Sequence, residues 1–300
     1  MTDLAGDLFD PSAPLTPTGN LRRRELVNRM WEASATAAAV LALGALGVVI
    51  YSVVTRGAPA LSWHFLTSSP SLAGGSGSGI APAIVGTALI VAVATAIAMP
   101  LGVLIAVYLT EFSNKRTAQA VRLVLDLLNG LPTIVIALFV FGLLVAGHHQ
   151  SGFAGSFALS IIMLPLIARA SQEVLLLVPH SLREAADALG VSRWRSILTV
   201  VLPSALGGIV TATVLAVARA AGETAPMLVL SSIYADKVSA NLFGQAIPNI
   251  PFTIFTLSEQ ADPAGFERAW GAALVLLAFI LVASLGARAL LARSRSKFSQ

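Results

Sequence analysis

The sequence SLREAADALGVSRWRSILTVVLP, residues 181–203, carries five charged side chains and lies between two long apolar runs. Charged side chains are costly inside a bilayer, so this polar loop is expected to lie outside the lipid. Ser181 and Glu184 have the spacing of a capping box, in which each side chain accepts a hydrogen bond from a backbone N–H at the start of a helix. Gly190 is the residue type that most readily ends a helix in the left-handed conformation. The loop therefore predicts a first short helix that begins at Ser181 and ends near Gly190.

A second short helix is expected after this glycine. Ser192 can cap its start, and Leu202–Pro203 is expected to end it before the next apolar run. Each helix has one apolar side, which suits either a groove on another protein or the surface of the bilayer. The residues of the polar loop alone leave both roles open.

The composition is that of a membrane protein. Of the 300 residues, 56% are hydrophobic and 11% are charged, far from the balance of a soluble domain. Cysteine is absent and the four histidines lack a zinc-ligand spacing, so no metal site and no catalytic residues are predicted. The net charge of +4 comes from basic residues scattered between apolar runs, which does not predict nucleic-acid binding.

Apolar runs make up most of the chain on both sides of the polar loop. A helix needs about 20 apolar residues to cross a bilayer core of about 30 Å. Six runs qualify and predict an all-α, polytopic membrane protein with six transmembrane helices: 33–54, 80–109, 123–146, 153–178, 205–230 and 270–290.

The basic residues predict the orientation of these spans. Fourteen of the 19 Lys and Arg side chains flank the spans on one side, and cytoplasmic loops hold the excess of basic residues. We therefore expect a multi-pass protein of the cytoplasmic (plasma) membrane with both termini inside. The expected parts are a cytoplasmic tail at 1–32, a transmembrane domain at 33–290 with the polar loop inside the cell, and a cytoplasmic tail at 291–300. The arginines at 22–24 either set this topology or contact lipid headgroups.

Two of the predicted spans carry charged pairs. Arg169 stands four residues before Glu173, and Arg219 four residues before Glu223, so each Glu is a candidate partner on the same helix face. An arginine deep in a span costs about 2.5–3.5 kcal/mol on insertion scales and is expected to face a water-filled interior. The pairs could merely neutralise each other. Alternatively, the guanidinium groups could bind an oxyanion along a pathway.

The third span begins with polar and helix-breaking residues. Asn129, Gly130 and Pro132 are expected to break or start this helix. Asp126, one turn earlier, is expected to cap the helix or to pair locally. Glycines within the spans, among them Gly86 and Gly208, are expected to allow close helix packing.

Twenty residues of the polar loop fit a known pattern. Glu-Ala-Ala, three residues, Gly, nine residues, an apolar residue, any residue and Leu-Pro resembles the EAA loop of ABC-importer permeases. Valine stands where that family usually has isoleucine. The resemblance implies the type I (MetI-like) permease fold and a coupling helix that inserts into a cytoplasmic ATPase. The positions that match are Glu184, Ala185, Ala186, Gly190, Val200, Leu202 and Pro203.

The chain contains no G-x-x-x-x-G-K-[ST] phosphate loop, and GGSGSG at residues 74–79 lacks the lysine of that motif. The resemblance therefore implies a non-catalytic transport subunit that has no cofactor of its own. ATP and Mg²⁺ would bind to the partner ATPase.

Three further segments resemble the A-type permease of the phosphate-specific (Pst) ABC importers. They are IAPAIVGT at 80–87, NGLPTIVIALFVF at 129–141 and ARAAGETAPML at 218–228. The resemblance implies import of inorganic phosphate by alternating access, with Arg169, Arg219 and Glu223 matching the charged pathway residues of that family. It also implies membrane lipid around the chain and three protein partners: a related permease in a heterodimer, a cytoplasmic ATPase dimer and an extracytoplasmic phosphate-binding protein.

Other kinds of membrane protein share some of these features. An ABC permease for sulfate, molybdate or an organic solute remains open, because guanidinium groups favour oxyanions generally. An ion-coupled secondary transporter would need a coupling site, often within inverted repeats, and the chain has no second copy of its charged segment in the opposite topology. A purely anchoring subunit would have no need of the charges within the spans.

Overall fold

A computed structural model describes residues 19–70, 78–234, 237–260 and 262–298, and these residues form helices and connecting segments without a β-strand. The chain divides into one compact unit up to Ser52 and another from Val53 onward. Most of the predicted N-terminal tail and most of the GGSGSG segment lie outside the described residues.

The first unit contains most of α1 (Gly19–Gly57), a helix of 39 residues. This helix begins just before the arginines at 22–24 and continues through the whole of the predicted span 33–54. It contains a stretch long and apolar enough to cross a membrane. The first predicted span is therefore confirmed as one continuous apolar helix.

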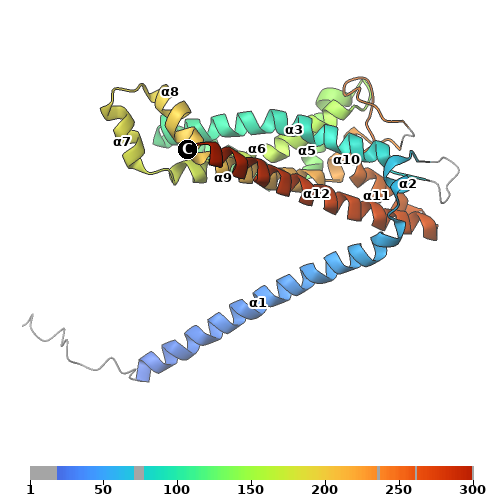
Figure 1. The fold of residues 1–300 in the computed structure, drawn as a ribbon, viewed down its shortest axis with the longest axis horizontal. Coiled ribbons are helices and arrows are strands. Elements are labelled where there is room, and N and C mark those ends of the chain that lie inside the picture. The colour runs from blue at the N-terminus through green and yellow to red at the C-terminus, as the bar shows by residue number, and fades with distance from the viewer. Residues whose placement is uncertain (1–18, 71–77, 235–236, 261, 299–300) are drawn as a thin grey trace, which may run out of the picture. The chain divides into compact units, whose positions relative to one another are not determined.

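Four long helices form the body of the second unit: α3 (Ala81–Val107), α6 (Gly152–Leu176), α9 (Leu202–Ala221) and α12 (Pro263–Phe298). They run lengthwise beside one another (Figure 1). Met163 and Ile167 of α6 are fully buried in a core that also takes side chains from α3, α9 and the segment before α11. α6 packs against α3 and α9, and also against the helices that lie between α3 and α6 along the chain. It is therefore the central helix of this unit.

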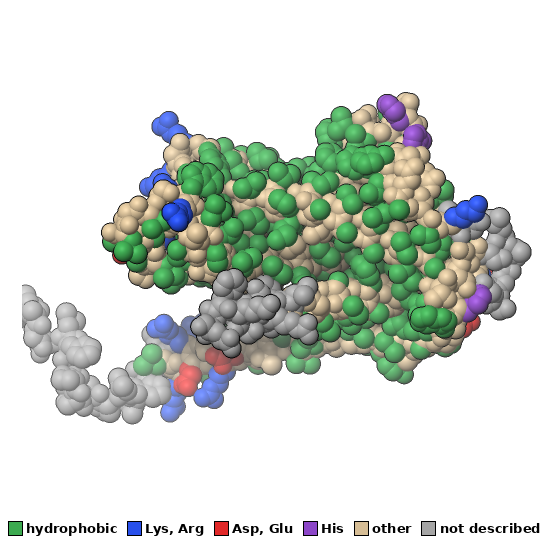
Figure 2. All heavy atoms as spheres, turned by 45° about the horizontal axis from the view of Figure 1, so that its top comes forward, with side chains coloured by type: hydrophobic (Ala, Val, Ile, Leu, Met, Phe, Trp, Pro, Cys, Tyr) green, Lys and Arg blue, Asp and Glu red, His purple; other side chains and the backbone are tan. Residues whose placement is uncertain are grey.

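The surface of the second unit is largely apolar. Figure 2 shows hydrophobic side chains over most of the face in view, with several Lys and Arg side chains at the end that carries α7 (His180–Ala188) and α8 (Arg193–Ser196). Among the described residues, five helices are long and apolar enough to cross a membrane, and a sixth crossing results if the bent pair α4 and α5 forms one span. Apolar helices with an apolar exterior are expected of a protein whose surroundings are lipid.

The third predicted span, 123–146, is not one straight helix. α4 (Lys115–Gly130) ends at a break, and α5 (Thr133–Val140) with the π-helical turn η3 (Phe141–Val145) continues at an angle of 98°. Leu131 and Pro132 are extended, with ψ of 135° and 133°. Proline has no N–H and disfavours the helical conformation of the residue before it. The expected break near Pro132 is confirmed, and the predicted span consists of two helices at an angle instead of one straight helix.

The fifth predicted span, 205–230, differs from its prediction at both ends. α8 (Arg193–Ser196), the π-helical turn η4 (Ile197–Val201) and α9 follow one another directly, so Leu202–Pro203 does not end a helix. Pro203 fits because it stands in the first turn of α9, where a missing N–H costs little. At the other end, α9 stops at Ala221, and α10 (Ala225–Leu230) begins with Pro226 in its own first turn.

The segment 231–266, expected to be an outer loop, contains a helix. α11 (Ile250–Glu259) buries one side, and Asn249 caps it by accepting a hydrogen bond from the Phe252 N–H at 3.0 Å. Ser231 binds the backbone just before α11. Its hydroxyl donates to the Ile247 carbonyl at 2.9 Å and accepts from the Ile247 N–H at 2.8 Å. Two short elements, η1 (Ala58–Ala60) and α2 (Trp63–Thr67), lie between α1 and α3 along the chain.

Glycines allow backbone contact between α3 and its neighbours. A Cβ atom on Gly86 would overlap the carbonyl oxygen of Pro248 and lie 2.6 Å from a side-chain carbon of Ile247. A Cβ atom on Gly102 would lie 2.9 Å from Ile167 of α6. The expectation that glycines permit close packing is confirmed at these two positions, and at Gly208 as well, where Val174 occupies the space.

Gly86→Ala is expected to lower the free energy of unfolding by about 1–3 kcal/mol, because the added methyl group overpacks a contact with rigid backbone. Denaturant titration of the purified protein in detergent measures this change. Gly286→Ala in α12 is the matched control, because no atom lies within 4 Å of its added Cβ. Equal stability of the two variants would contradict the close packing of α3 on the segment before α11.

Candidate functional site

The polar loop at residues 181–203 lies at one end of the helical body. α7 (His180–Ala188) and α8 project there, at the opposite end from α2 and α11 (Figure 1). Gly190 has φ of 69°, the left-handed conformation that glycine adopts without strain. The predicted helix, glycine and second helix are therefore confirmed, although the second helix continues into α9.

The predicted caps of these two helices are not formed. α7 begins one residue earlier than expected, its N-cap residue is Pro179, and neither Pro179 nor Ser192 provides a side-chain cap. The fixed φ of Pro179 and its carbonyl, which accepts from the Leu182 N–H at 3.2 Å, start the helix instead. The capping box of Ser181 and Glu184 was a wrong prediction, because Ser181 lies inside the helix.

One side of the polar loop exposes large apolar side chains. Leu189 is 82% exposed and Trp194 is 57% exposed, and Leu182 and Leu198 are exposed as well. Glu184 and Ala185 are exposed, whereas Ala186 is buried and accepts a backbone hydrogen bond from Val191 at 3.0 Å. Leu202 and Pro203 stand at the start of α9 and are at least partly exposed. Such an apolar surface beside charged residues is typical of a docking face.

The inner side of the polar loop binds the end of α3 through a residue that sequence reasoning missed. Glu111 lies in the π-helical turn η2 (Tyr108–Phe112) that follows α3, and its side chain is only 9% exposed. Its carboxylate accepts from Arg183 of α7 at 3.0 Å. The one available signal was an isolated acid beside Lys115 and Arg116, at a boundary where basic residues prevail.

Arg169 does not pair with Glu173 as predicted. Its guanidinium donates to both carboxylate oxygens of Asp126 in α4, at 2.5 and 2.6 Å, while Glu173 is exposed. An Arg that precedes a Glu by four residues is the less favourable order on a helix. The α4 helix packs against α6 and supplies a bidentate partner instead. The expectation that Asp126 caps the helix or pairs locally is wrong, because its partner lies 43 residues away.

Arg219 and Glu223 do form the predicted pair, but loosely. Their closest nitrogen and oxygen atoms are 3.8 Å apart, and the pair spans the break between α9 and α10. Half of the Arg219 side chain is exposed, compared with 17% of Glu223. Glu223 also lines a small cavity together with Thr87 and Asn249, which has room for about one water molecule. No ion pair connects this pair to Arg169 within the part of the chain that the structure describes.

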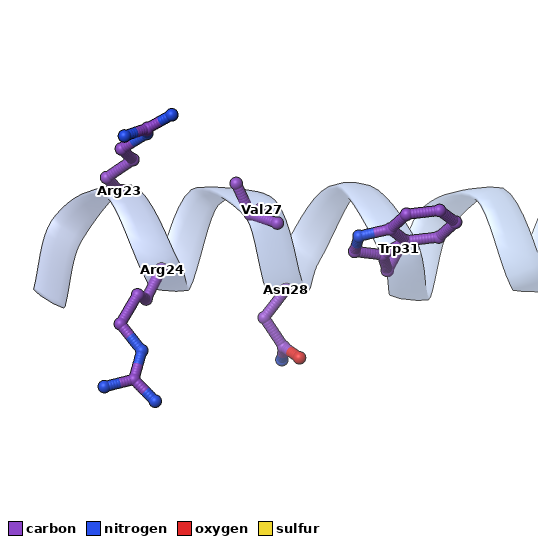
Figure 3. Close-up of a pocket in the computed structure, with 5 residues that line it drawn as sticks. All are labelled: Arg23, Arg24, Val27, Asn28 and Trp31. Atoms are coloured by element: carbon purple, nitrogen blue, oxygen red, sulfur yellow. The ribbon is translucent and has the colours of Figure 1, made fainter. Parts of the chain in front are cut away.

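Two arginines also lie next to each other on a shallow surface of α1. Arg23, Arg24, Val27, Asn28 and Trp31 line it. Arg23 and Arg24 project to opposite sides of the helix (Figure 3), so their guanidinium groups do not converge on one anion. Among the described residues, no group of three or more His, Asp and Glu side chains could hold a metal ion.

Residues 98–296 match the family described as binding-protein-dependent transport system inner membrane component. The chain belongs to this family. It is 38% identical over 290 residues to the phosphate transport system permease protein PstA 1 of Mycobacterium tuberculosis, with 93% of each chain covered. It is 36% identical over 249 residues to the phosphate transport system permease protein PstA of Yersinia pestis, covering 82% of this chain and 84% of that protein.

Two solved structures have a similar fold. A chain of the bacterial alginate ABC transporter, in complex with its alginate-bound periplasmic protein, matches with a TM-score of 0.62 at 17% identity, covering 88% of this chain and 94% of that one. A chain of the inward-facing MetNI methionine ABC transporter matches with a TM-score of 0.55 at 18% identity, covering 71% and 92%. The predicted all-α permease fold of ABC importers is confirmed, and so is the resemblance to the A-type Pst permeases.

A double-mutant cycle with Asp126→Ala and Arg169→Ala is expected to give a coupling free energy of about 0.5–1 kcal/mol, since both side chains are partly exposed and the pair is bidentate. Unfolding in detergent measures it. The matched cycle with Arg169→Ala and Glu173→Ala should give a coupling near zero. A larger coupling to Glu173 than to Asp126 would refute the partner assigned here.

Proposed function

We propose that the chain is a transmembrane permease subunit of an ATP-driven importer of inorganic phosphate. The relatives that it matches over most of its length are named as phosphate permeases. The observation that carries the proposal is the position of Arg219, a half-exposed guanidinium at the end of an apolar helix that can cross a membrane.

Arg219 shares its side of α9 with exposed apolar residues. Leu215, one turn earlier, is 72% exposed. Lipid would suit Leu215 but not a charged guanidinium, whereas a water-filled pathway beside a second protein suits both. This side of α9 is therefore proposed to face the pathway, which the related permease of a heterodimer would complete.

The arginines favour an anion as the transported substrate. A guanidinium group can bind two oxygens of one phosphate in parallel hydrogen bonds. In the structure each arginine faces a carboxylate: Asp126 for Arg169 and Glu223 for Arg219. In the proposed transport cycle, phosphate displaces the carboxylate from each guanidinium in passing. The carboxylate then returns to its guanidinium group, so neither arginine carries an unpaired charge when the pathway is empty.

The ATPase is proposed to dock on the exposed apolar side of the polar loop. Leu182, Leu189, Trp194 and Leu198 would enter a groove of the ATPase, with Glu184 at its edge. The ATPase dimer binds ATP and Mg²⁺, and the permease takes no part in hydrolysis. A phosphate-binding protein delivers the anion at the opposite end. Both termini and the polar loop are proposed to lie in the cytoplasm, as the basic residues predict.

Anion competition tests the substrate. The complex of both permeases, the ATPase and the binding protein is reconstituted into liposomes, and ATP-dependent uptake of labelled phosphate is measured. A 100-fold excess of sulfate or molybdate is expected to leave uptake unchanged, while unlabelled phosphate abolishes it. Inhibition by sulfate or molybdate equal to that by phosphate would instead favour a general oxyanion permease, and uptake without the ATPase would favour a secondary transporter.

Arg219→Ala is expected to lower phosphate uptake at least tenfold while the complex still assembles, because the pathway loses a charged ligand. Phosphate uptake by Arg219→Lys should lie between that of wild type and that of Arg219→Ala, since lysine keeps the charge but loses the planar guanidinium group. Arg116→Gln, which removes an exposed charge from α4, is the matched control. Normal uptake by Arg219→Ala, or by the charge-swapped Arg219→Glu with Glu223→Arg, would remove Arg219 from the pathway.

A further inference from the structure

We propose that Glu111 is a positioning residue that fixes the polar loop to α3, so that movement of α7 is transmitted to the membrane helices through its carboxylate. The inference rests on the proposed function in one respect, the docking of an ATPase on the polar loop. It assigns a role to a buried acid for which the proposed anion pathway has no use.

Arg183 connects three elements at one point. Its Nε and Nη2 donate to one carboxylate oxygen of Glu111, at 3.2 and 3.0 Å. Its Nη1 donates to the Val178 carbonyl at 2.7 Å, and its Nη2 also donates to the Leu175 carbonyl at 3.0 Å. These carbonyls lie at the end of α6, where carbonyls lack regular helical partners, although the Leu175 carbonyl also accepts from the Val178 N–H at 3.3 Å. One guanidinium group of α7 thus binds the ends of both α3 and α6.

The second half of the polar loop binds the same place. Arg193 of α8 donates to the backbone carbonyl of Glu111 and lies over the Phe112 ring at 5.1 Å. The Trp194 ring packs against the Phe112 ring, with centroids 4.8 Å apart. Both halves of the loop therefore converge on two adjacent residues, Glu111 and Phe112. Leu182, Leu189 and Leu198 and the exposed part of Trp194 remain accessible for docking.

Few other contacts hold α7 in place. Ala186 is its one buried side chain, and an alanine buries little apolar surface. The ion pair, by contrast, is mostly shielded from water, with 18% of Arg183 and 9% of Glu111 exposed. Shielded charge pairs are sensitive to the loss of either partner. The orientation of α7 relative to α3 therefore depends on the pair more than on packing.

The end of α3 is itself bound tightly to the body of the protein. Ala106 and Val107 lie in a buried cluster with Leu175 of α6 and with Ile197 and Ala205 of η4 and α9. Gly102 lets α3 approach Ile167 of α6 at van der Waals distance. A displacement applied to Glu111 therefore moves α3 together with its neighbours. Without the carboxylate, α7 could shift about the turn at Gly190 while α3 stays in place.

The first test measures phosphate imported for each ATP hydrolysed by the reconstituted complex. Glu111→Gln keeps the size of the side chain but removes its charge. We expect hydrolysis to stay within twofold of wild type and import for each ATP to fall at least threefold. A residue that only supports folding would reduce the amount of complex and leave this ratio unchanged, which would overturn the proposal. Arg183→Lys, which cannot bind the carboxylate and both carbonyls at once, should give the same uncoupling and covers the case that Glu111→Gln fails to assemble.

The second test does not depend on the substrate. The chain contains no cysteine, so spin labels can be placed at Leu104→Cys in α3 and Ala188→Cys in α7, both at exposed positions. The distance distribution between them is measured in the complete complex, with cysteine-free partner subunits. Glu111→Gln should broaden this distribution at least twofold, whereas Arg116→Gln should not. An unchanged width would refute the positioning role of Glu111, even if phosphate uptake is confirmed. A broader distribution would support this role, even if the complex proves to transport another anion.

Discussion

A bilayer interior offers no water to a free backbone N–H or C=O, and this constraint determines where the chain can leave the helical conformation. The break between α4 and α5 satisfies it with Pro132, which has no N–H, and with a hydrogen bond from the Leu131 N–H to the Leu127 carbonyl at 3.1 Å. At the end opposite the polar loop, Thr87 of α3 accepts from the Ile250 N–H at 2.8 Å, and Asn249 donates to the Ser231 carbonyl at 3.0 Å. Several of the buried polar side chains, among them Ser151, Ser231 and Asn249, thus lie where a helix begins or ends.

The sequence predicts the apolar helices well and their interruptions less well. Hydropathy is a property of each segment, so the runs at 33–54, 80–109, 153–178 and 270–290 all lie within or largely within helices. Whether a proline breaks a helix depends on what surrounds it. Pro132 ends α4, yet Pro203 and the interior Pro165 of α6 lie in continuous helical segments. The helix α11 was missed because it is short and depends on packing against α12 and α3.

The prediction of functional residues from the sequence is limited in the same way, because it depends on residues that are close together along the chain. The EAA pattern predicts the polar loop from sequence because its residues are neighbours along the chain. The partners of Arg169 and Arg183, in contrast, stand 43 and 72 residues away. Local spacing therefore gave Arg169 the wrong acid, and it offered no partner for Arg183. Only the packing of α4 on α6 and of α7 beside the end of α3 brings these charges together, and no periodicity of the sequence encodes that packing.

The two arginines of the proposed pathway differ in how strongly their carboxylates hold them. Asp126 binds Arg169 at 2.5 and 2.6 Å, with two oxygens, whereas Glu223 stays 3.8 Å from Arg219. An anion must compete with the carboxylate that it displaces, so Arg219 is the easier of the two to occupy. Arg169 yields to an anion only if α4 moves relative to α6, because its partner is carried by another helix. Occupation of Arg169 is therefore coupled to helix movement in a way that occupation of Arg219 is not.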